Sequence, residues 1–307
     1  MKSKSKKNAW IWGIVGLVIL TTLIIILNQP KDERVSLNLT HIHGLGFTSD
    51  GSRLVIPAHD GLASYTNNRW QSDEGEKHDY MGFNLVDNSF YSSGHPERGS
   101  DLKNPLGIVK SNDNGKTLEF MDFYGIEDFH GMAVGYKSHA IYLFNPQANA
   151  RLSTAGIYVS LDETKTWKMS SLNGLSGDMI SLAAHPTDKD TVAIGTSKGA
   201  YLSADFGDQF DKLPIEQEVT AVAFGNNGDL FIGGRGILFR NKAGEITPLS
   251  VLPLSPDDAI TYIAQNPIRE NELAIATATM NVFTSIDNGL SWSQIVKEGE
   301  GLSIESG

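Results

Sequence analysis

The residues best suited to chemistry in this chain are its histidines, because seven of the eight lie between positions 41 and 139. The candidates at the edges of predicted strands, together with one aspartate, are His43, His59, His95, His130 and Asp79. Imidazole and carboxylate groups form a ligand set for zinc, copper, iron or manganese. These residues are far apart in the sequence, so folding must bring them together before they can bind a divalent metal or another ligand.

Two other roles are open for the same histidines. They could hydrogen-bond to water and to backbone groups between neighbouring structural units, or they could act as general acids and bases. Met132 and Met280 lie near these positions, and we expect them to pack rather than to bind a soft metal.

A polar segment at residues 94–107 is unusually long for the loop of a compact domain. Long ordered loops are often functional. Glu97 and Asp101 within it are the candidate catalytic carboxylates, although the segment could equally be a solvated lid.

A repeated sequence motif predicts the strands and turns that must position these residues. Four segments, beginning at residues 111, 160, 203 and 285, follow the pattern Ser-x-Asp-x-Gly-x-Thr/Ser-aromatic with some variation. Their recurring members are Asp113, Asp162, Asp205, Asp287, Gly115, Gly207, Gly289, Trp167 and Trp292. Aspartate accepts hydrogen bonds from turn amides, glycine supplies a positive φ, and the aromatic residue packs between sheets. We therefore expect each segment to close a β-hairpin.

This pattern resembles the Asp-box, or bacterial neuraminidase repeat, of sialidases, sortilin-type receptors and photosystem assembly factors. The resemblance implies a β-propeller in which the repeat has a structural role. Over most of residues 38–297 the chain is also similar to membrane-anchored bacterial propellers named glycosylhydrolases. The stretches that carry this similarity are HIHGLG, IPAHDG, SGH, GSDLKNPLG and DFHGM.

Turn signals divide each repeat into four short strands. In two successive repeats we expect strands at residues 179–184, 191–195, 200–203 and 209–213, then at 220–224, 230–232, 237–240 and 245–249. With weaker repeats near residues 66 and 241 the mean spacing is about 44 residues. This spacing predicts an all-β, six-bladed propeller. Seven blades are the alternative, if the leftover segments 35–39 and 302–305 form a blade.

The propeller fold assigns each loop to a face. The upper face receives the start of the first strand and the loop after the second strand of each blade, and the lower face receives the Asp-box turns. His43, His59, His95 and His130 are all predicted on the upper face, near the mouth of the central channel. His139 and His185 are predicted in turns of the lower face.

Whether the protein is an enzyme is left open by the sequence. The Asp-box suggests a sialidase-like glycoside hydrolase, and Arg98, Arg151 and Arg235 are predicted on the upper face, where sialidases bind the substrate carboxylate. However, the chain lacks the Phe/Tyr-Arg-Ile-Pro element, and no Tyr–Glu nucleophile pair can be assigned. We expect a ligand-, metal- or partner-binding propeller, with a glycosyl hydrolase acting on cell-surface or environmental glycans as the alternative.

The N-terminal region predicts a membrane anchor. Residues 9–27 form an uncharged run of nineteen residues, long enough to cross a hydrocarbon core of about 30 Å. Four lysines precede this run, so the positive-inside rule places the N-terminus in the cytoplasm and the propeller outside the cell. We expect a basic tip (1–8), a transmembrane signal-anchor helix (9–27), a linker (28–37), the propeller (38–297) and a C-terminal tail (298–307).

Composition limits the remaining possibilities. The net charge is −11 although the N-terminal tip is basic, and this acidic body argues against nucleic-acid binding. The absence of cysteine rules out disulfides and Cys-ligated zinc, and it agrees with a cell-surface protein of a Gram-positive bacterium. We expect a monomer that meets a glycan, peptide or protein ligand at its upper face.

Overall fold

The computed structural model describes residues 37–72, 75–252, 254–255 and 257–302. The chain divides into two compact units, residues 1–35 and residues 36–307, and only the second is described below. The predicted basic tip, the predicted transmembrane helix at residues 9–27 and nearly all of the predicted linker lie outside the described residues. Within the described ranges, no helix is long and apolar enough to cross a membrane.

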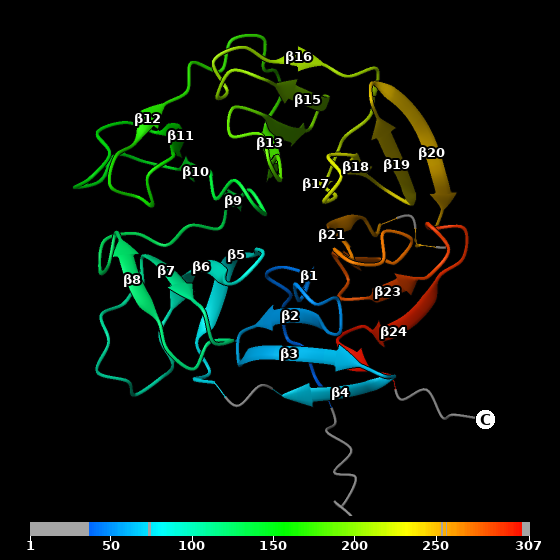
Figure 1. Cartoon of the computed structure of the whole chain (residues 1–307), viewed down its shortest axis with the longest axis horizontal. Coiled ribbons are helices and arrows are strands. Elements are labelled where there is room, and N and C mark those ends of the chain that lie inside the picture. Colours follow the sequence, from blue (N-terminus) through cyan, green and yellow to red (C-terminus); the bar gives the residue numbers. More distant parts are fainter. Residues whose placement is uncertain (1–36, 73–74, 253, 256, 303–307) are drawn as a thin grey trace, which may run out of the picture. The chain divides into compact units, whose positions relative to one another are not determined.

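Six antiparallel sheets form the blades of a β-propeller, which confirms the predicted fold (Figure 1). Blade one contains β1 (Gly46–Phe47), β2 (Leu54–Ala58), β3 (Gly61–Thr66) and β4 (Arg69–Ser72). Blade two contains β5 (Asp79–Leu85), β6 (Phe90–His95), β7 (Ile108–Ser111) and β8 (Glu119–Asp122). Blade three contains β9 (Met132–Val134), β10 (Ile141–Asn145), β11 (Gly156–Ser160) and β12 (Lys168–Met169).

The other three blades repeat this order. Blade four contains β13 (Met179–Ala184), β14 (Val192–Thr196), β15 (Gly199–Ser203) and β16 (Asp211–Lys212). Blade five contains β17 (Ala221–Phe224), β18 (Leu230–Gly233), β19 (Ile237–Lys242) and β20 (Glu245–Val251). Blade six contains β21 (Ile260–Gln265), β22 (Leu273–Thr277), β23 (Val282–Ser285), β24 (Ser293–Lys297) and β25 (Glu300–Gly301).

The first strand of each blade contacts the first strands of both neighbouring blades, and β1 contacts β21, so the ring is closed. Residues 37–39 do not form a seventh blade. They lie along β25: Leu39 N donates to Gly299 O (2.8 Å), Gly301 N donates to Leu37 O (3.0 Å), and Asn38 faces Glu300 in a β-bridge. The two ends of the described ring are therefore joined at the outer edge of blade six.

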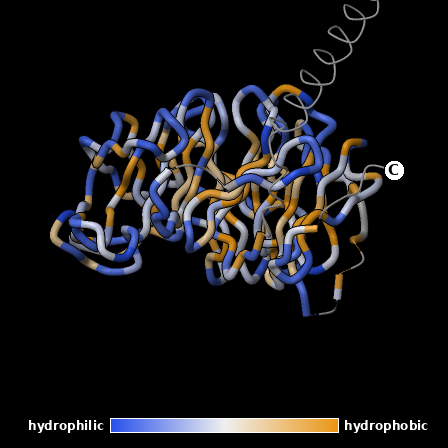
Figure 2. Tube along the Cα trace, turned by 90° about the horizontal axis from the view of Figure 1, so that it is seen from below, coloured by the Kyte–Doolittle hydropathy of each residue, from blue (hydrophilic) through white to orange (hydrophobic). Residues whose placement is uncertain are grey.

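Apolar side chains between neighbouring blades form the core. The second strands β2, β14 and β22 are fully buried, as expected of short apolar runs that have a sheet face on each side. Where the ring closes, Leu54 and Ile56 of blade one pack with Val282 and Ile295 of blade six. Figure 2 shows apolar segments concentrated in the middle of the ring, between loops that are mostly hydrophilic.

The Ser-x-Asp segments form the turns between the third and fourth strands of their blades. In the turn before β24, Ser285 Oγ donates to Asp287 Oδ1 (2.8 Å), and Asp287 accepts from Ser291 N (2.9 Å) and Ser291 Oγ (2.6 Å). The Ser291 hydroxyl, then its backbone N–H, lower the pKa of Asp287 to about 2. The same serine and turn-amide contacts recur at Asp113, Asp162 and Asp205. These aspartates thus hold hairpins on the lower face.

Backbone conformation explains the glycines of this pattern. Gly115, Gly207 and Gly289 have φ of 84°, 82° and 82°, in the left-handed region where other residues are strained. In blade three the equivalent position is Thr164, with φ of 67°.

The aromatic residues of the pattern pack between blades. Trp167 of blade three stacks edge-on against Phe123 at 5.8 Å and donates from Nε1 to Asp122 Oδ2 (3.1 Å). Trp292 packs in the apolar cluster that blades five and six share.

Candidate functional site

Four residues from blades one and two meet on the upper face and are named the first cluster: His41, His43, His59 and Asp79. The two histidines at 41 and 43 precede β1, His59 lies in the turn between β2 and β3, and Asp79 begins β5. The cluster therefore spans the seam between blades one and two.

The Asp79 carboxylate lies between two imidazoles. Its Oδ2 is 2.6 Å from His59 Nδ1, a short hydrogen bond in which the imidazole N–H donates. Its Oδ1 is 3.4 Å from His43 Nε2. Asp79 Oδ1 and His43 Nε2 are both buried, and neither has a hydrogen-bond partner within the described part of the chain.

The three imidazole rings lie against one another. The His41 and His43 rings are stacked with centroids 5.9 Å apart, and the His59 ring meets them edge-on at 4.6 and 4.9 Å. Burial lowers the pKa of His43 below its usual value, and the Asp79 carboxylate opposes this shift. The neighbouring imidazoles, including His130, lower this pKa further. A lowered pKa favours the neutral imidazole, which is the form that binds metals.

This geometry fits a metal ion. One ligand atom from each of His43, His59 and Asp79 lies within 4.8 Å of the others. Two ligand atoms with bonds of about 2.1 Å to a tetrahedral ion lie about 3.4 Å apart, and His43 Nε2 and Asp79 Oδ1 have this separation. His41, which is exposed, is close enough to His59 to serve as a further ligand.

A second cluster spans the seam between blades two and three and consists of His95, Asn104, Asp128 and His130. His130 Nε2 is 3.1 Å from Asp128 Oδ2, and His95 Nε2 is 3.6 Å from the same oxygen. His95 Nδ1 makes a 2.6 Å hydrogen bond to Asn104 Oδ1. The His130 side chain is 67% exposed, so this cluster is more open than the first.

The structure therefore divides the predicted histidines between two places. His43, His59 and Asp79 come together, whereas His95 and His130 lie with Asp128. Sequence reasoning did not select His41 or Asp128. Each stands two residues before a selected histidine, and this spacing was the signal that could have found them, since residues i and i+2 of an extended chain point to the same side.

The long segment at residues 94–107 connects β6 to β7 on the upper face. Glu97 Oε2 accepts from Lys77 N (3.1 Å), and Glu97 N donates to Nδ1 of the buried His78 (2.9 Å). These bonds fasten the start of the segment to the chain before β5. Asp101, the other candidate carboxylate, is exposed.

Two arginines predicted on the upper face pair with nearby carboxylates. Arg151 makes a bidentate ion pair with Asp122, with distances of 2.9 and 2.7 Å. Arg235 Nε is 3.5 Å from Glu218 Oε1.

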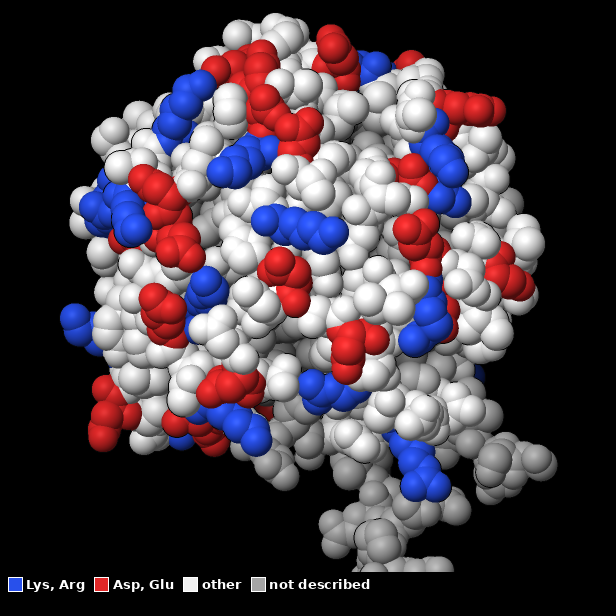
Figure 3. Space-filling model, in the orientation of Figure 1, with Lys and Arg blue, Asp and Glu red and all other residues white. Residues whose placement is uncertain are grey.

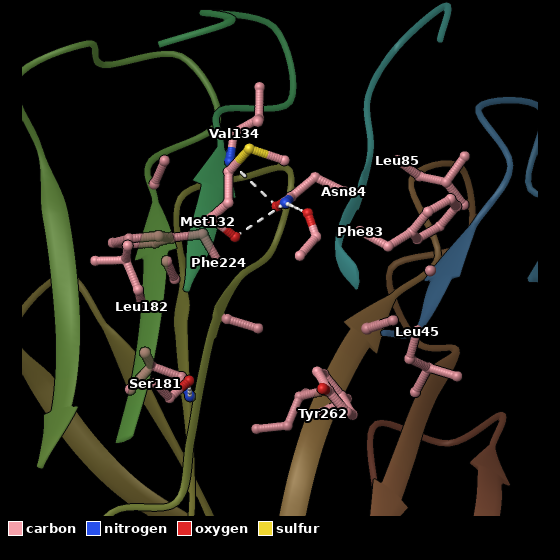
Figure 4. A pocket seen from close by; sticks show the side chains of 18 of the residues that line it. Leu45, Phe83, Asn84, Leu85, Met132, Val134, Ser181, Leu182, Phe224 and Tyr262 are labelled. Carbon is pink, nitrogen blue, oxygen red and sulfur yellow. Dashed lines mark hydrogen bonds between the residues drawn. The ribbon is translucent and has the colours of Figure 1, made fainter. Parts of the chain in front are cut away.

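A cavity of about 370 Å³ occupies the central channel. The first strand of every blade contributes to its wall, and Figure 4 shows Leu45, Phe83, Met132, Leu182 and Tyr262 around it. His43 and His130 also line it, so each cluster contributes one imidazole to the wall.

Comparison with known proteins supports the fold. No protein-family model and no curated protein sequence matches the chain. A GH74 xyloglucanase from Xanthomonas campestris matches with 14% identity and a TM-score of 0.54, over 86% of this chain and 46% of that one. A GH74 enzyme from Niastella koreensis matches with 16% identity and a TM-score of 0.55, over 85% of this chain and 46% of that one. This chain therefore spans less than half the length of either enzyme.

A smaller protein also shares the fold. A gluconolactonase from Xanthomonas campestris matches with 12% identity and a TM-score of 0.57, over 81% of this chain and 87% of that one. At these identities the likeness shows the propeller fold alone.

Proposed function

We propose that this protein is a metal-binding β-propeller that holds a divalent transition metal between His43, His59 and Asp79. The observation that carries this proposal is the pair of buried atoms His43 Nε2 and Asp79 Oδ1, 3.4 Å apart and without hydrogen-bond partners among the described residues. Buried polar atoms are rarely left unpaired. A cation between the two atoms satisfies both, and the imidazole and carboxylate ligands favour zinc or a similar ion.

The test is a zinc titration of the full-length protein, purified in detergent and stripped with a chelator. We expect one equivalent of tightly bound zinc, measured by competition with a chromophoric chelator and by elemental analysis. The His43→Ala/Asp79→Asn double variant should lose this equivalent.

A matched control is available on the lower face. His139 Nε2 forms an ordinary 2.9 Å hydrogen bond with Asp87 Oδ1, so the His139→Ala/Asp87→Asn double variant also removes one His–Asp pair. It should retain the zinc. A wild-type protein without stoichiometric metal, or equal zinc binding in the two double variants, would rule the site out.

A glycoside hydrolase is the second candidate function. Its support is the fold shared with the two GH74 enzymes, and at 14 and 16% identity this likeness assigns no catalytic carboxylate. Sugar release from a glycan panel that disappears in Glu97→Gln or Asp101→Asn would favour the hydrolase.

We also propose that the propeller is an Asp-box protein anchored to the membrane, with its ring outside the cell. The turn hydrogen bonds of the four Ser-x-Asp segments support the Asp-box assignment, and the apolar run at residues 9–27 behind its lysines supports the anchor. The chain has no cysteine, so an Ile268→Cys variant carries a single thiol, at a residue that is 63% exposed. A membrane-impermeant thiol reagent should label it in intact cells. Labelling only after lysis would reverse the proposed orientation.

A further inference from the structure

Histidines are the only basic or acidic residues among the described residues that line the central channel. Among the described residues that line the cavity there is no Lys, Arg, Asp or Glu, although these residues make up 20% of the chain. Figure 3 shows acidic and basic side chains spread over one face of the molecule. The charged side chains of the described chain thus lie outside the lining of the cavity.

Several polar groups of the wall are already used within the protein. Asn84 Nδ2 donates to Gly82 O (2.9 Å) and Met132 O (3.0 Å), and Asn84 Oδ1 accepts from Val134 N (3.1 Å). Figure 4 shows Asn84 joining two blades in this way. Its hydrogen-bonding capacity is largely spent on the fold, which leaves little for a ligand.

Two other polar side chains of the wall have the same role. Ser181 Oγ accepts from Val222 N (3.0 Å), and Thr220 Oγ1 donates to Ile260 O (2.6 Å). Each bond joins neighbouring blades. With Leu45, Phe83, Met132 and Leu182 also in the wall, the cavity offers a ligand both polar and apolar contacts.

Besides His43 Nε2, the wall residues have another buried polar atom without a hydrogen-bond partner in the described part of the chain. Gln265 Nε2 donates to Glu270 O (2.7 Å), but Gln265 Oε1 is buried and has no hydrogen-bond partner among the described residues. This residue ends β21 on the lower side, opposite the histidine clusters. A ligand with a hydroxyl or amide N–H would satisfy this oxygen once the Gln265 side chain turned toward the cavity, because the atom is buried in this structure.

We propose that the channel binds a small, uncharged molecule that has both polar and apolar groups and carries a hydrogen-bond donor for Gln265. The wall offers an anion no lysine or arginine and a cation no aspartate or glutamate, so it favours an uncharged ligand. The volume of about 370 Å³ lies at the lower end of the roughly 300–1,000 Å³ that small-molecule pockets occupy. A single small molecule fits this space. The inference concerns the channel and goes beyond the proposed metal site.

The absence of cysteine from the chain permits a direct test. Ala223 lines the cavity, is only partly buried, and can be replaced by cysteine with little change in volume. Iodoacetamide and iodoacetate are nearly the same size and attack the same thiolate, but only iodoacetate is charged. Their relative rates at one thiol report charge exclusion, because any effect of burial on the pKa of that thiol cancels.

The experiment uses full-length Ala223→Cys in detergent with a chelator present, and intact-mass spectrometry follows the alkylation. The exposed Ile268→Cys thiol is the control. We expect the ratio of the iodoacetamide rate to the iodoacetate rate to be at least tenfold higher at position 223 than at position 268. Equal ratios, or no alkylation at position 223 until denaturant is added, would overturn the proposal. Ser181→Cys, which is nearly isosteric, provides a second channel thiol if Ala223→Cys does not fold.

A second arm tests occupancy with matched probes. Benzamide, which is neutral and donates hydrogen bonds, should slow alkylation of the channel thiol, and benzoate at the same concentration should not. The Gln265→Leu change should weaken the protection by benzamide. Protection by benzoate as well, or by neither probe, would contradict the inference. The alkylation experiments are done without metal, so they are independent of zinc binding. If the protein does not bind zinc but benzamide still protects the channel thiol, only the metal site is disproved. If the protein binds zinc but benzamide does not protect the thiol, only the channel proposal is disproved.

Discussion

Asp79 and His95 lie directly opposite each other at the upper ends of β5 and β6, yet they contact different blades. The Asp79 carboxylate contacts His43 and His59 of blade one, and His95 faces Asp128, which precedes β9 of blade three. The β-carbons of such opposite residues are about 5 Å apart. Blade two therefore links the two clusters, and substitutions on its two strands can separate them.

A matched pair of charge-removing substitutions tests which cluster holds the metal. Asp79→Asn should weaken zinc binding at least about 100-fold, because it removes a ligand and the hydrogen-bond acceptor that orients His59. Asp128→Asn makes the same chemical change in the second cluster and should alter the affinity less than about threefold. Affinities come from competition with a chromophoric chelator at fixed pH. A larger loss in Asp128→Asn would move the site to the second cluster.

At the seam between blades two and three, we expect loss of the Asp122 carboxylate to destabilise the protein more than loss of its partner Arg151. It is 10% exposed and accepts from Arg151 and from the Trp167 indole. Because Arg151 is 45% exposed, Arg151→Ala should lower the free energy of unfolding by about 1 kcal/mol. Asp122→Ala should cost about 2 kcal/mol, since it leaves a half-buried indole N–H and a guanidinium without their acceptor. Urea unfolding measures both values, and the opposite ranking would contradict this assignment.

Replacing glycine by alanine in the lower-face turns should lower stability through backbone strain, and two positions allow this strain to be separated from steric contact of the new Cβ. Gly244 has φ of 90°, and a Cβ there would meet nothing within 4 Å. Gly244→Ala should therefore cost only the left-handed strain of about 1 kcal/mol. Gly289 has φ of 82°, and its Cβ would lie 3.3 Å from Trp292, so Gly289→Ala should cost more. Thermal unfolding compares the two, and a smaller loss for Gly289→Ala would refute this reasoning.

His185 predicts a pH dependence of stability. Burial lowers the pKa of His185, against the opposing effect of Asp188 and Asp190. Its Nδ1 accepts from Asp188 N (3.0 Å), as only an unprotonated ring nitrogen can. The unfolded chain gains this proton near pH 6.5, whereas the folded chain gains it at lower pH. The stability contributed by this difference is complete above pH 6.5 and is lost as the pH falls toward the folded pKa.

The His185→Asn variant retains a hydrogen-bond acceptor but cannot titrate. Between pH 7 and pH 5 its urea midpoint should fall less than that of the wild-type protein. Parallel curves for the two proteins would show that His185 does not titrate differently on folding.

Much of the fold could be predicted from the sequence, because turn residues have strict backbone requirements. The strand expected at residues 179–184 is β13 (Met179–Ala184), and the repeat spacing gave the number of blades correctly. The outermost strands were predicted less well: β16 is Asp211–Lys212, shorter than the expected 209–213. Both of its residues are exposed, so little apolar periodicity marks where such a strand begins and ends.

The site was less predictable because it depends on side-chain direction at strand ends. Loop placement indicated that His43, His59, His95 and His130 lie on the upper face. It could not indicate that Asp79 and His95, which are paired across one sheet, contact opposite blades. That outcome depends on the twist of β5 and β6 and on the packing of each neighbour, which no spacing in the sequence encodes.

The junction between residues 37–39 and β25 has a mechanical consequence. Two backbone hydrogen bonds, Leu39 N to Gly299 O and Gly301 N to Leu37 O, join the first described residues of the ring to its last strand. Tension applied at residue 37 would reach these bonds before it reached any blade interior. The junction, with the buried Leu39 side chain beside it, would thus bear such a load before His41 of the first cluster, which follows two residues later.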